Sequence, residues 1–259
     1  LLFLELARAP LAGQPVVAFG VTVLTAQLSM ALLARLLKRP LGLGGPAFTS
    51  VFQTVARWNS YVALALTASL FGREGLPLTA IAVAVMVPTG NVISVLALAR
   101  HGTATTTGPR ALVRAVVTNP LILASLGGAA WNATGVPLPY LAGEVLGLLG
   151  RATLALGLLS VGAGLMLSAM TTRPLVLLVA AGLKLVVKPL MAFLVGRLLG
   201  LDGTALGVAV LVAAVPTSTT AYILARLLGG DAELMAALIT VTTLAAMLTL
   251  PLVLATLAG

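Results

Sequence analysis

The stretch AVPTSTTAYI, residues 214–223, interrupts a long apolar run with a proline and a series of hydroxyl side chains. Pro216 has no backbone N–H and disrupts the helical turn before it. The backbone groups freed in this way cannot face lipid, so they must face protein or a wet cavity. The stretch therefore predicts a broken membrane helix, with Pro216, Thr217 and Ser218 as candidate binding residues.

The composition around this stretch is that of a membrane protein. Of the 259 residues, 60% are hydrophobic and 8% are charged, whereas soluble domains carry about 25% charged residues. Absence of cysteine excludes disulfides and thiol chemistry, and a single histidine with six acidic residues argues against a metal site. The net charge of +9 is scattered over segment ends, which favours a topology signal over nucleic-acid binding. We expect an all-α polytopic membrane protein with no metal, cofactor or nucleic-acid partner.

Eight apolar stretches are long enough to cross a bilayer, which takes about 20 residues. They cover residues 15–37, 47–71, 76–99, 118–136, 141–170, 173–200, 204–228 and 232–258. A ninth stretch, residues 1–10, is too short to span. We interpret it as the end of a helix that begins before this sequence.

The two halves of the chain form a repeat. A shift of 157 residues aligns the segment starts at 47 and 204 without a gap, and it pairs Gly72 with Gly229 at two helix ends. The same shift predicts that about 40 residues, one helix and most of the next, are missing at the N-terminus. Five helices in each half then give the halves opposite orientations, which is the inverted-repeat architecture of secondary transporters.

This repeat divides the chain into three parts. We expect an incomplete N-terminal repeat over residues 1–100, a cytoplasmic linker over 101–117 and a five-helix C-terminal repeat over 118–259. The linker is short, polar and rich in threonine and glycine. Basic residues such as Lys38 and Arg100 collect on its side of the predicted topology, and the positively charged side of a membrane protein is cytoplasmic.

The polar stretch at 214–223 has a counterpart in the first half. At the 157-residue shift, RWNSYVAL (57–64) aligns with AVPTSTTA, and Asn59 aligns with Pro216. Paired interruptions in the two halves indicate the binding site of a transporter, and exposed helix N-termini favour an anion. The alternative is a kinked helix whose Ser and Thr side chains bond their own backbone. Because two stretches coincide, we favour a site that includes Asn59 and Ser60.

Two cations and one amide extend this candidate site. Arg57 and Lys184 lie within predicted spans, where cations line a cavity or pair with another group. A substrate carboxylate is one such partner, and snorkelling to the interface is the alternative, which holds at least as strongly for Lys188 and Arg151. Asn91 follows Pro88 and Gly90 in the span 76–99 and either lines the same cavity or bonds a neighbouring helix.

Several motifs resemble the auxin efflux carrier family and occur in that family's order. They include VFQTVARWNSYVALALTASLFG, VMVPTGNVISVLAL, LKLVVKPLMAFLVGRLLGLDG and VLVAAVPTSTTAYILARLLGGDAEL. The resemblance covers nearly the whole chain and is that of a bacterial member truncated at its N-terminus. It implies ten helices in two inverted five-helix repeats, with broken crossover helices over 47–71 and 204–228. Asn59 and Pro216 match the family's crossover residues.

The resemblance also implies a function. Bacterial members are associated with malonate, malate and related dicarboxylates, plant members carry auxin, and related carriers form homodimers. We therefore predict a secondary carrier of small organic anions in the cytoplasmic membrane. Its site comprises Arg57, Asn59, Ser60, Asn91, Lys184, Pro216, Thr217 and Ser218. Alternating access around the crossover would move the substrate.

Other functions remain open at this stage. A carrier of the bile-acid/sodium symporter type would require sodium, and a membrane scaffold or sensor would carry no flux. An intramembrane enzyme would need buried catalytic acids or a nucleophile–base pair, and the sequence shows neither clearly, so we predict no enzyme. The coupling ion, proton or sodium, has no evident acidic ligand in the spans.

Overall fold

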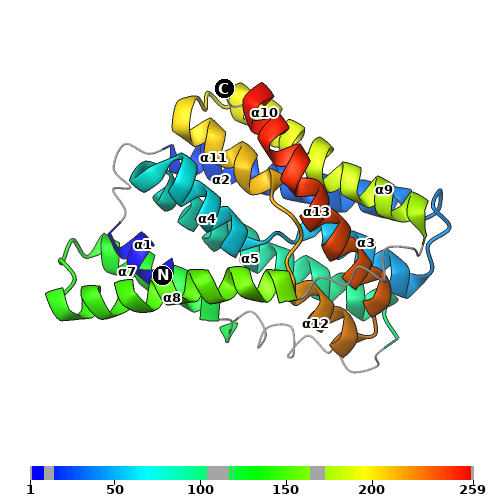
Figure 1. Cartoon of the computed structure of the whole chain (residues 1–259), viewed down its shortest axis with the longest axis horizontal. Helices are drawn as coiled ribbons and strands as arrows, with labels where there is room; N and C mark the ends of the chain where they lie inside the picture. Colours follow the sequence, from blue (N-terminus) through cyan, green and yellow to red (C-terminus); the bar gives the residue numbers. More distant parts are fainter. Residues whose placement is uncertain (1, 9–14, 104–116, 119, 164–172, 258–259) are drawn as a thin grey trace.

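The computed structural model describes residues 2–8, 15–103, 117–118, 120–163 and 173–257. Every regular element in these ranges is a helix, which confirms the all-α prediction (Figure 1). In chain order the helices are α1 (Leu2–Ala7), α2 (Val16–Leu37), α3 (Gly45–Ala56), α4 (Ser60–Leu70), α5 (Gly72–His101), α7 (Pro120–Ala133), α8 (Tyr140–Ala163), α9 (Pro174–Gly182), the π-helical turn η2 (Leu183–Val187), α10 (Lys188–Leu198), α11 (Gly203–Ala214), α12 (Thr220–Leu228) and α13 (Ala232–Leu257).

Apolar side chains on the outside of the bundle confirm that the protein crosses a membrane. Four continuous helical stretches are long and apolar enough to span a bilayer: α2, α5, α9 through α10, and α13. Leu178 and Leu248, on two of these stretches, are 71% and 74% exposed. Water would solvate such surfaces poorly, whereas lipid tails are as apolar as leucine.

The predicted segments correspond closely to the helices. Segments 15–37 and 232–258 are single helices, α2 and α13, whose ends agree with the prediction within one residue. Segments 47–71 and 204–228 are each divided into two helices, as a pair of broken helices requires. The structure follows segment 141–170 to Ala163, and residues 164–170 with most of the predicted linker 101–117 lie outside the described ranges.

Contacts between the halves show how the two repeats are related. The 157-residue shift maps α2 onto α9–α10, α3 onto α11, α4 onto α12 and α5 onto α13. The contacts occur in exchanged pairs: α3 packs on α13 as α11 packs on α5, and α3 packs on α12 as α11 packs on α4. A twofold axis between the halves accounts for this exchange, and the opposite orientation of the halves in the membrane stays a prediction.

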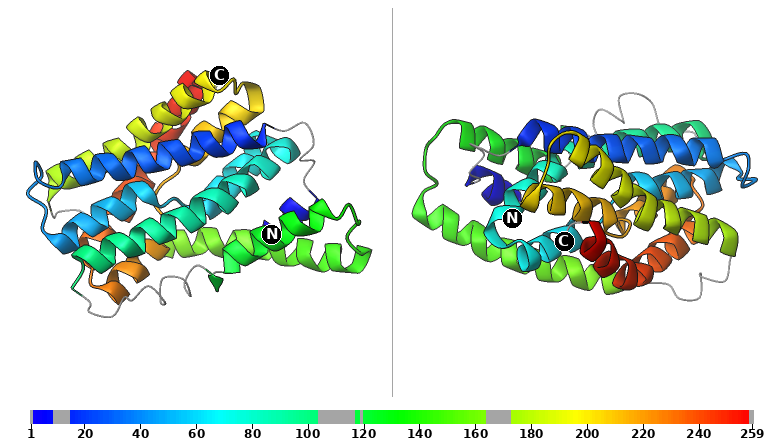
Figure 2. Two further views of the ribbon diagram at one scale, coloured as in Figure 1. Left: turned by 180° about the vertical axis from the view of Figure 1, so that it is seen from behind. Right: turned by 90° about the horizontal axis from the view of Figure 1, so that it is seen from above.

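The first parts of the two broken helices, α3 and α11, lie largely buried among the other helices (Figure 2). Residues 206–215, which include most of α11, are all buried. They pack in an apolar cluster with Phe19, Trp58 and Met86, and α3 packs in a second cluster with Met30 and Met235. Because lipid tails are as apolar as the helix surfaces, close packing supplies the energy of association between membrane helices. Small side chains permit this close packing. Three alanines pack together where α2, α10 and α11 meet: Ala26, Ala192 and Ala213.

Lys38 and His101, which both lie on the predicted cytoplasmic side, meet at one end of the bundle. Lys38 Nζ lies 3.3 Å from His101 Nδ1, and the His101 ring meets the Phe48 ring edge-on with 5.0 Å between centroids. A Cβ added at Gly45 would collide with the backbone carbonyl of His101, so glycine allows this close approach. These contacts join the connection between α2 and α3 to the end of α5.

Candidate functional site

The first helix break is short and capped. Helix α3 ends at Ala56, Arg57 has extended backbone angles (φ −99°, ψ 156°), and α4 begins at Ser60. The Asn59 side chain accepts a hydrogen bond from the Val62 backbone N–H at 3.2 Å. Asparagine is among the best N-cap residues because its side chain satisfies one of the free N–H groups of the first turn. The local sequence thus starts a new helix in the middle of the protein.

The second helix break is set by proline. Helix α11 ends at Ala214, and Val215 is extended (φ −62°, ψ 151°), as a residue before proline prefers. Pro216 offers no N–H to the preceding turn, and α12 begins at Thr220. The break therefore covers residues 215–219, inside the stretch that the sequence singled out.

The two breaks touch each other. The Asn59 backbone N–H donates to the Pro216 carbonyl at 2.9 Å. Thr217 Oγ1 donates to the Thr54 carbonyl at 2.9 Å, which ties the second break to the last turn of α3. The pairing of Asn59 with Pro216 by the repeat is therefore also a direct contact in space.

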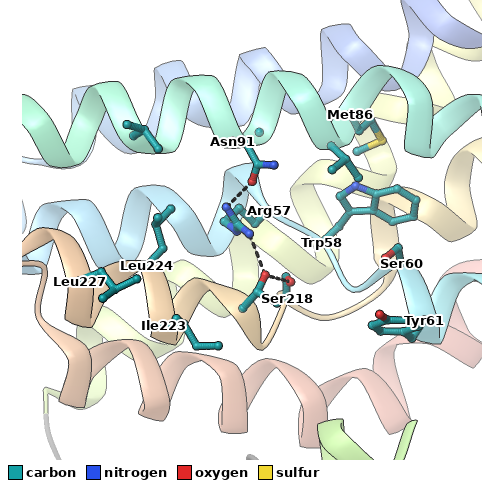
Figure 3. A pocket seen from close by; sticks show the side chains of 14 residues that line it. Arg57, Trp58, Ser60, Tyr61, Met86, Asn91, Ser218, Ile223, Leu224 and Leu227 are labelled. Atoms are coloured by element: carbon teal, nitrogen blue, oxygen red, sulfur yellow. Dashed lines mark hydrogen bonds between the residues drawn. The ribbon is translucent and has the colours of Figure 1, made fainter. Parts of the chain in front are cut away.

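A cavity of about 430 Å³ opens beside this contact (Figure 3). Its polar lining comes from the first break, α4, α5, the second break and α12. The polar and aromatic residues around it are Arg57, Trp58, Ser60, Tyr61, Asn91, Ser218 and Thr220. The rest of the lining is Gly90 and apolar residues, among them Met86, Val87 and Leu224.

Arg57 points into the cavity between two neutral side chains (Figure 3). Its Nη1 donates to Asn91 Oδ1 and its Nη2 to Thr220 Oγ1, both at 2.7 Å. Ser218 Oγ lies 2.9 Å from Thr220 Oγ1 and extends this network. Arg57 Nε is buried and makes no hydrogen bond to any described residue. The guanidinium is thus held in place while its charge is left without a counter-ion in its hydrogen-bond network.

Two helix N-termini add to this positive charge. Helices α4 and α12 both begin at the crossing of the breaks, and their first residues, Ser60 and Thr220, line the cavity. The N-terminal end of a helix carries about half of an elementary positive charge and offers free N–H groups. The cavity therefore combines one guanidinium with two electropositive helix ends, an arrangement that attracts an anion.

The predicted site residues fall into three groups. Arg57, Ser60, Asn91 and Ser218 line the cavity. Asn59, Pro216 and Thr217 form the contact between the breaks and are buried. Lys184 is fully buried in η2 and does not line this cavity.

The sequence interpretation missed Trp58, Tyr61, Thr220 and the apolar part of the lining. Thr220 stood in the quoted stretch, two residues after Ser218, and Trp58 stood beside Arg57. Met86 and Leu224 carried no signal, because apolar residues are the rule in membrane helices. Within the described part of the chain, no group of three His, Cys, Asp or Glu residues is placed to hold a metal ion.

Comparisons with known proteins identify a family of membrane transporters. A family model described as membrane transport protein matches residues 14–254. An uncharacterized transporter from Methanothermobacter thermautotrophicus is 30% identical over 257 residues, which cover 97% of this chain and 82% of that protein.

Proposed function

The chain belongs to the membrane transport protein family, and we propose that it is a secondary carrier of small organic anions. The family match confirms the resemblance to auxin efflux carriers. The proposal rests on the position and charge of Arg57. Its guanidinium lies in the crossover cavity with the neutral partners Asn91 and Thr220. That the chain is a multi-pass membrane transporter follows from the family, and the substrate class and the secondary-carrier mechanism are the proposed parts.

The argument from Arg57 is electrostatic. A charge taken out of water is costly unless it is paired and hydrogen-bonded. The Arg57 side chain is half-buried, and Asn91 and Thr220 satisfy two of its five N–H donors without neutralising its charge. A carboxylate matches the planar fork of a guanidinium and would supply the missing charge.

The lining favours one carboxylate on an apolar body. Among the described residues that line the cavity, Arg57 is the one cationic side chain, and most of its neighbours there are apolar. A second carboxylate, as in malonate or malate, would find no second cationic side chain among the described residues of this lining, and an unpaired charge is unfavourable there. The volume of about 430 Å³ lies within the usual range for small-molecule sites. We therefore favour monocarboxylates with an aromatic or branched aliphatic body.

Transport would use the two breaks as the fixed centre of an alternating-access motion. In inverted-repeat carriers one bundle rocks against the other around the site. We place the carrier in the cytoplasmic membrane, with the basic end near Lys38 and His101 on the cytoplasmic side. Homodimerisation and the identity of a coupling ion stay predictions.

Uptake into proteoliposomes tests the proposal. Purified chain is reconstituted and offered labelled phenylacetate, indole-3-acetate, malonate and malate, with and without sodium and proton gradients. We expect saturable uptake of the two monocarboxylates, and strongly reduced uptake at low substrate concentration in the Arg57→Gln variant. The matched control is Arg197→Gln, which removes an exposed arginine on α10.

The outcomes separate the alternatives. Uptake of malonate or malate alone would overturn the monocarboxylate assignment while leaving a carrier. Absence of flux for every anion, from protein that unfolds cooperatively, would favour a scaffold or sensor. Uptake that requires sodium would favour a mechanism of the bile-acid symporter type.

A further inference from the structure

The broken end of α3 is held by donors from distant parts of the chain. A helix that ends inside a membrane leaves its last carbonyls without partners, and no bulk water reaches them there. Gln53 O accepts the Arg57 N–H of the break itself at 2.8 Å. The last three carbonyls take side-chain donors: Thr217 Oγ1 to Thr54 O at 2.9 Å, Lys188 Nζ to Val55 O at 3.0 Å and Gln27 Nε2 to Ala56 O at 2.7 Å.

Lys188 is the donor with a full charge among these three. Its side chain is 0% exposed, and its Nζ reaches a carbonyl that belongs to the other repeat. The C-terminal end of a helix carries about half of an elementary negative charge. An ammonium group is a compact charge with three N–H donors, so it can bind such an end as a free monovalent cation would.

The backbone around Lys188 is unusual. Lys188 follows the π-helical turn Leu183–Val187, and its backbone N–H donates to the Leu183 carbonyl. Pro189 comes next and contributes no N–H to the first turn of α10. Such π-turns are rare and frequently lie at functional sites. The turn contacts both broken helices, α3 and α11.

The repeat shows that this arrangement is asymmetric. The 157-residue shift pairs Lys184 with Gln27 and Lys188 with Ala31, so the first half has no lysine at either position. Gln27 donates to Ala56 O, whereas Lys184 Nζ is buried beside Lys188 and reaches no backbone carbonyl of the described residues. Of the two buried lysines, Lys188 alone binds a helix end.

We propose that the Lys188 ammonium is a tethered cation that occupies the carbonyl end of α3, in the place where a free coupling cation would otherwise bind. The inference rests on the proposed carrier function and makes Lys188 a positioning residue, since it acts through α3 and the break that follows it. Because the cation is part of the chain, neither folding nor transport requires Na⁺.

Thermal unfolding of the purified chain in detergent tests this proposal without any substrate. The melting temperature is measured in NaCl, methylammonium chloride and choline chloride at equal ionic strength. For the unmodified chain we expect equal values in all three salts. Lys188→Ala should lower the melting temperature by about 5 °C in choline chloride. Methylammonium or Na⁺ should recover a large part of that loss by entering the vacated space.

Two variants separate a tethered cation from ordinary packing. Lys188→Met fills the same space with an apolar side chain, so we expect a lower melting temperature that none of the three salts restores. Lys184→Met removes the neighbouring buried lysine, which binds no helix end, and should show no cation-specific response. If the melting temperature of Lys188→Ala falls and neither methylammonium nor Na⁺ restores it, the proposal is overturned. Saturable stabilisation of the unmodified chain by Na⁺, relative to choline, would also overturn it.

The tethered cation and the carrier function can be refuted separately. If the liposomes show no carboxylate flux, the proposed function fails while the melting temperatures still report on the cation. If the flux is present but requires Na⁺, the carrier stands and the tethered cation is refuted.

Discussion

Arg57 is the residue on which the chemistry of the pocket depends. It lies in the first break, where the backbone is extended, and its guanidinium bridges α5 and α12 through Asn91 and Thr220. An arginine in the regular part of a membrane helix would point along the helix and snorkel toward the interface. The break instead places Arg57 beside the helix N-termini, where an anion can approach.

We expect Arg57→Gln to raise the KM for the transported monocarboxylate by roughly 30-fold. That factor corresponds to about 2 kcal/mol, the lower end of what truncation of a hydrogen-bonded charge pair costs. The KM of Arg57→Lys should lie between those of the unmodified chain and Arg57→Gln, because lysine keeps the charge and loses the bidentate geometry of the guanidinium. Initial rates of uptake over a range of substrate concentrations give KM for each variant. An unchanged KM in Arg57→Gln would remove Arg57 from the site.

Asn59 acts on the backbone beside the pocket. Asn59→Ala removes the N-cap of α4 and should cost about 1 kcal/mol of stability, which corresponds to a melting temperature lower by about 2–4 °C. We also expect uptake to fall severalfold, because the start of α4 lines the cavity. Asn59→Ser keeps a capping oxygen and should retain both properties. Equal uptake by the Ala variant and the unmodified chain would show that this cap does not position the site.

At the scale of elements, the broken helices owe their geometry to each other. Helix α3 ends where Thr217 from the other repeat donates to its Thr54 carbonyl, and Asn59 in the first break donates to Pro216 in the second. The carbonyl end of α3 is therefore not satisfied by its own half alone. Local sequence stops each helix, but the partner break supplies the hydrogen bonds that make the stop tolerable inside a membrane.

Thr217→Val tests this mutual support. Valine nearly matches threonine in shape but leaves the buried Thr54 carbonyl without a donor, at a cost of about 1–3 kcal/mol. We expect a melting temperature lower by about 3–10 °C in detergent. Thr217→Ser keeps the hydroxyl, so its melting temperature should fall less than that of Thr217→Val. If Val and Ser behave alike, the hydrogen bond to Thr54 does not support the crossing.

At the scale of the whole molecule, the exchanged contacts relate the halves by a twofold axis. Inverted repeats place equivalent loops on opposite sides of the membrane. Pro40, between α2 and α3, and Asp202, between α10 and α11, are both exposed and occupy such equivalent loops.

Cysteine labelling tests the sidedness directly, because the chain contains no native cysteine. In intact cells, a membrane-impermeant maleimide should label Asp202→Cys and should leave Pro40→Cys unlabelled until the membrane is opened. The cysteine-free parent gives the background. Labelling of both positions from the same side would contradict the inverted orientation, and the reverse pattern would place the basic end outside the cell.

The sequence by itself determined the membrane class, the extent of the spans and the position of both breaks. These features are local: hydropathy sets the spans, Pro216 has no N–H to give, and Asn59 caps the next helix. Even the pairing of Asn59 with Pro216 followed from the repeat, because boundaries at a constant spacing require no knowledge of side-chain packing.

Only the tertiary structure decided which polar residues share a cavity. It brought Arg57, Asn91 and Thr220 together from three elements and placed Lys184 and Lys188 in the interior near the end of α3. The sequence treated Arg57 and Lys184 alike, since a cation within a span has the same composition signal wherever it points. The apolar lining was equally hidden, because lipid, core and pocket all accept the same side chains, and only packing separates them.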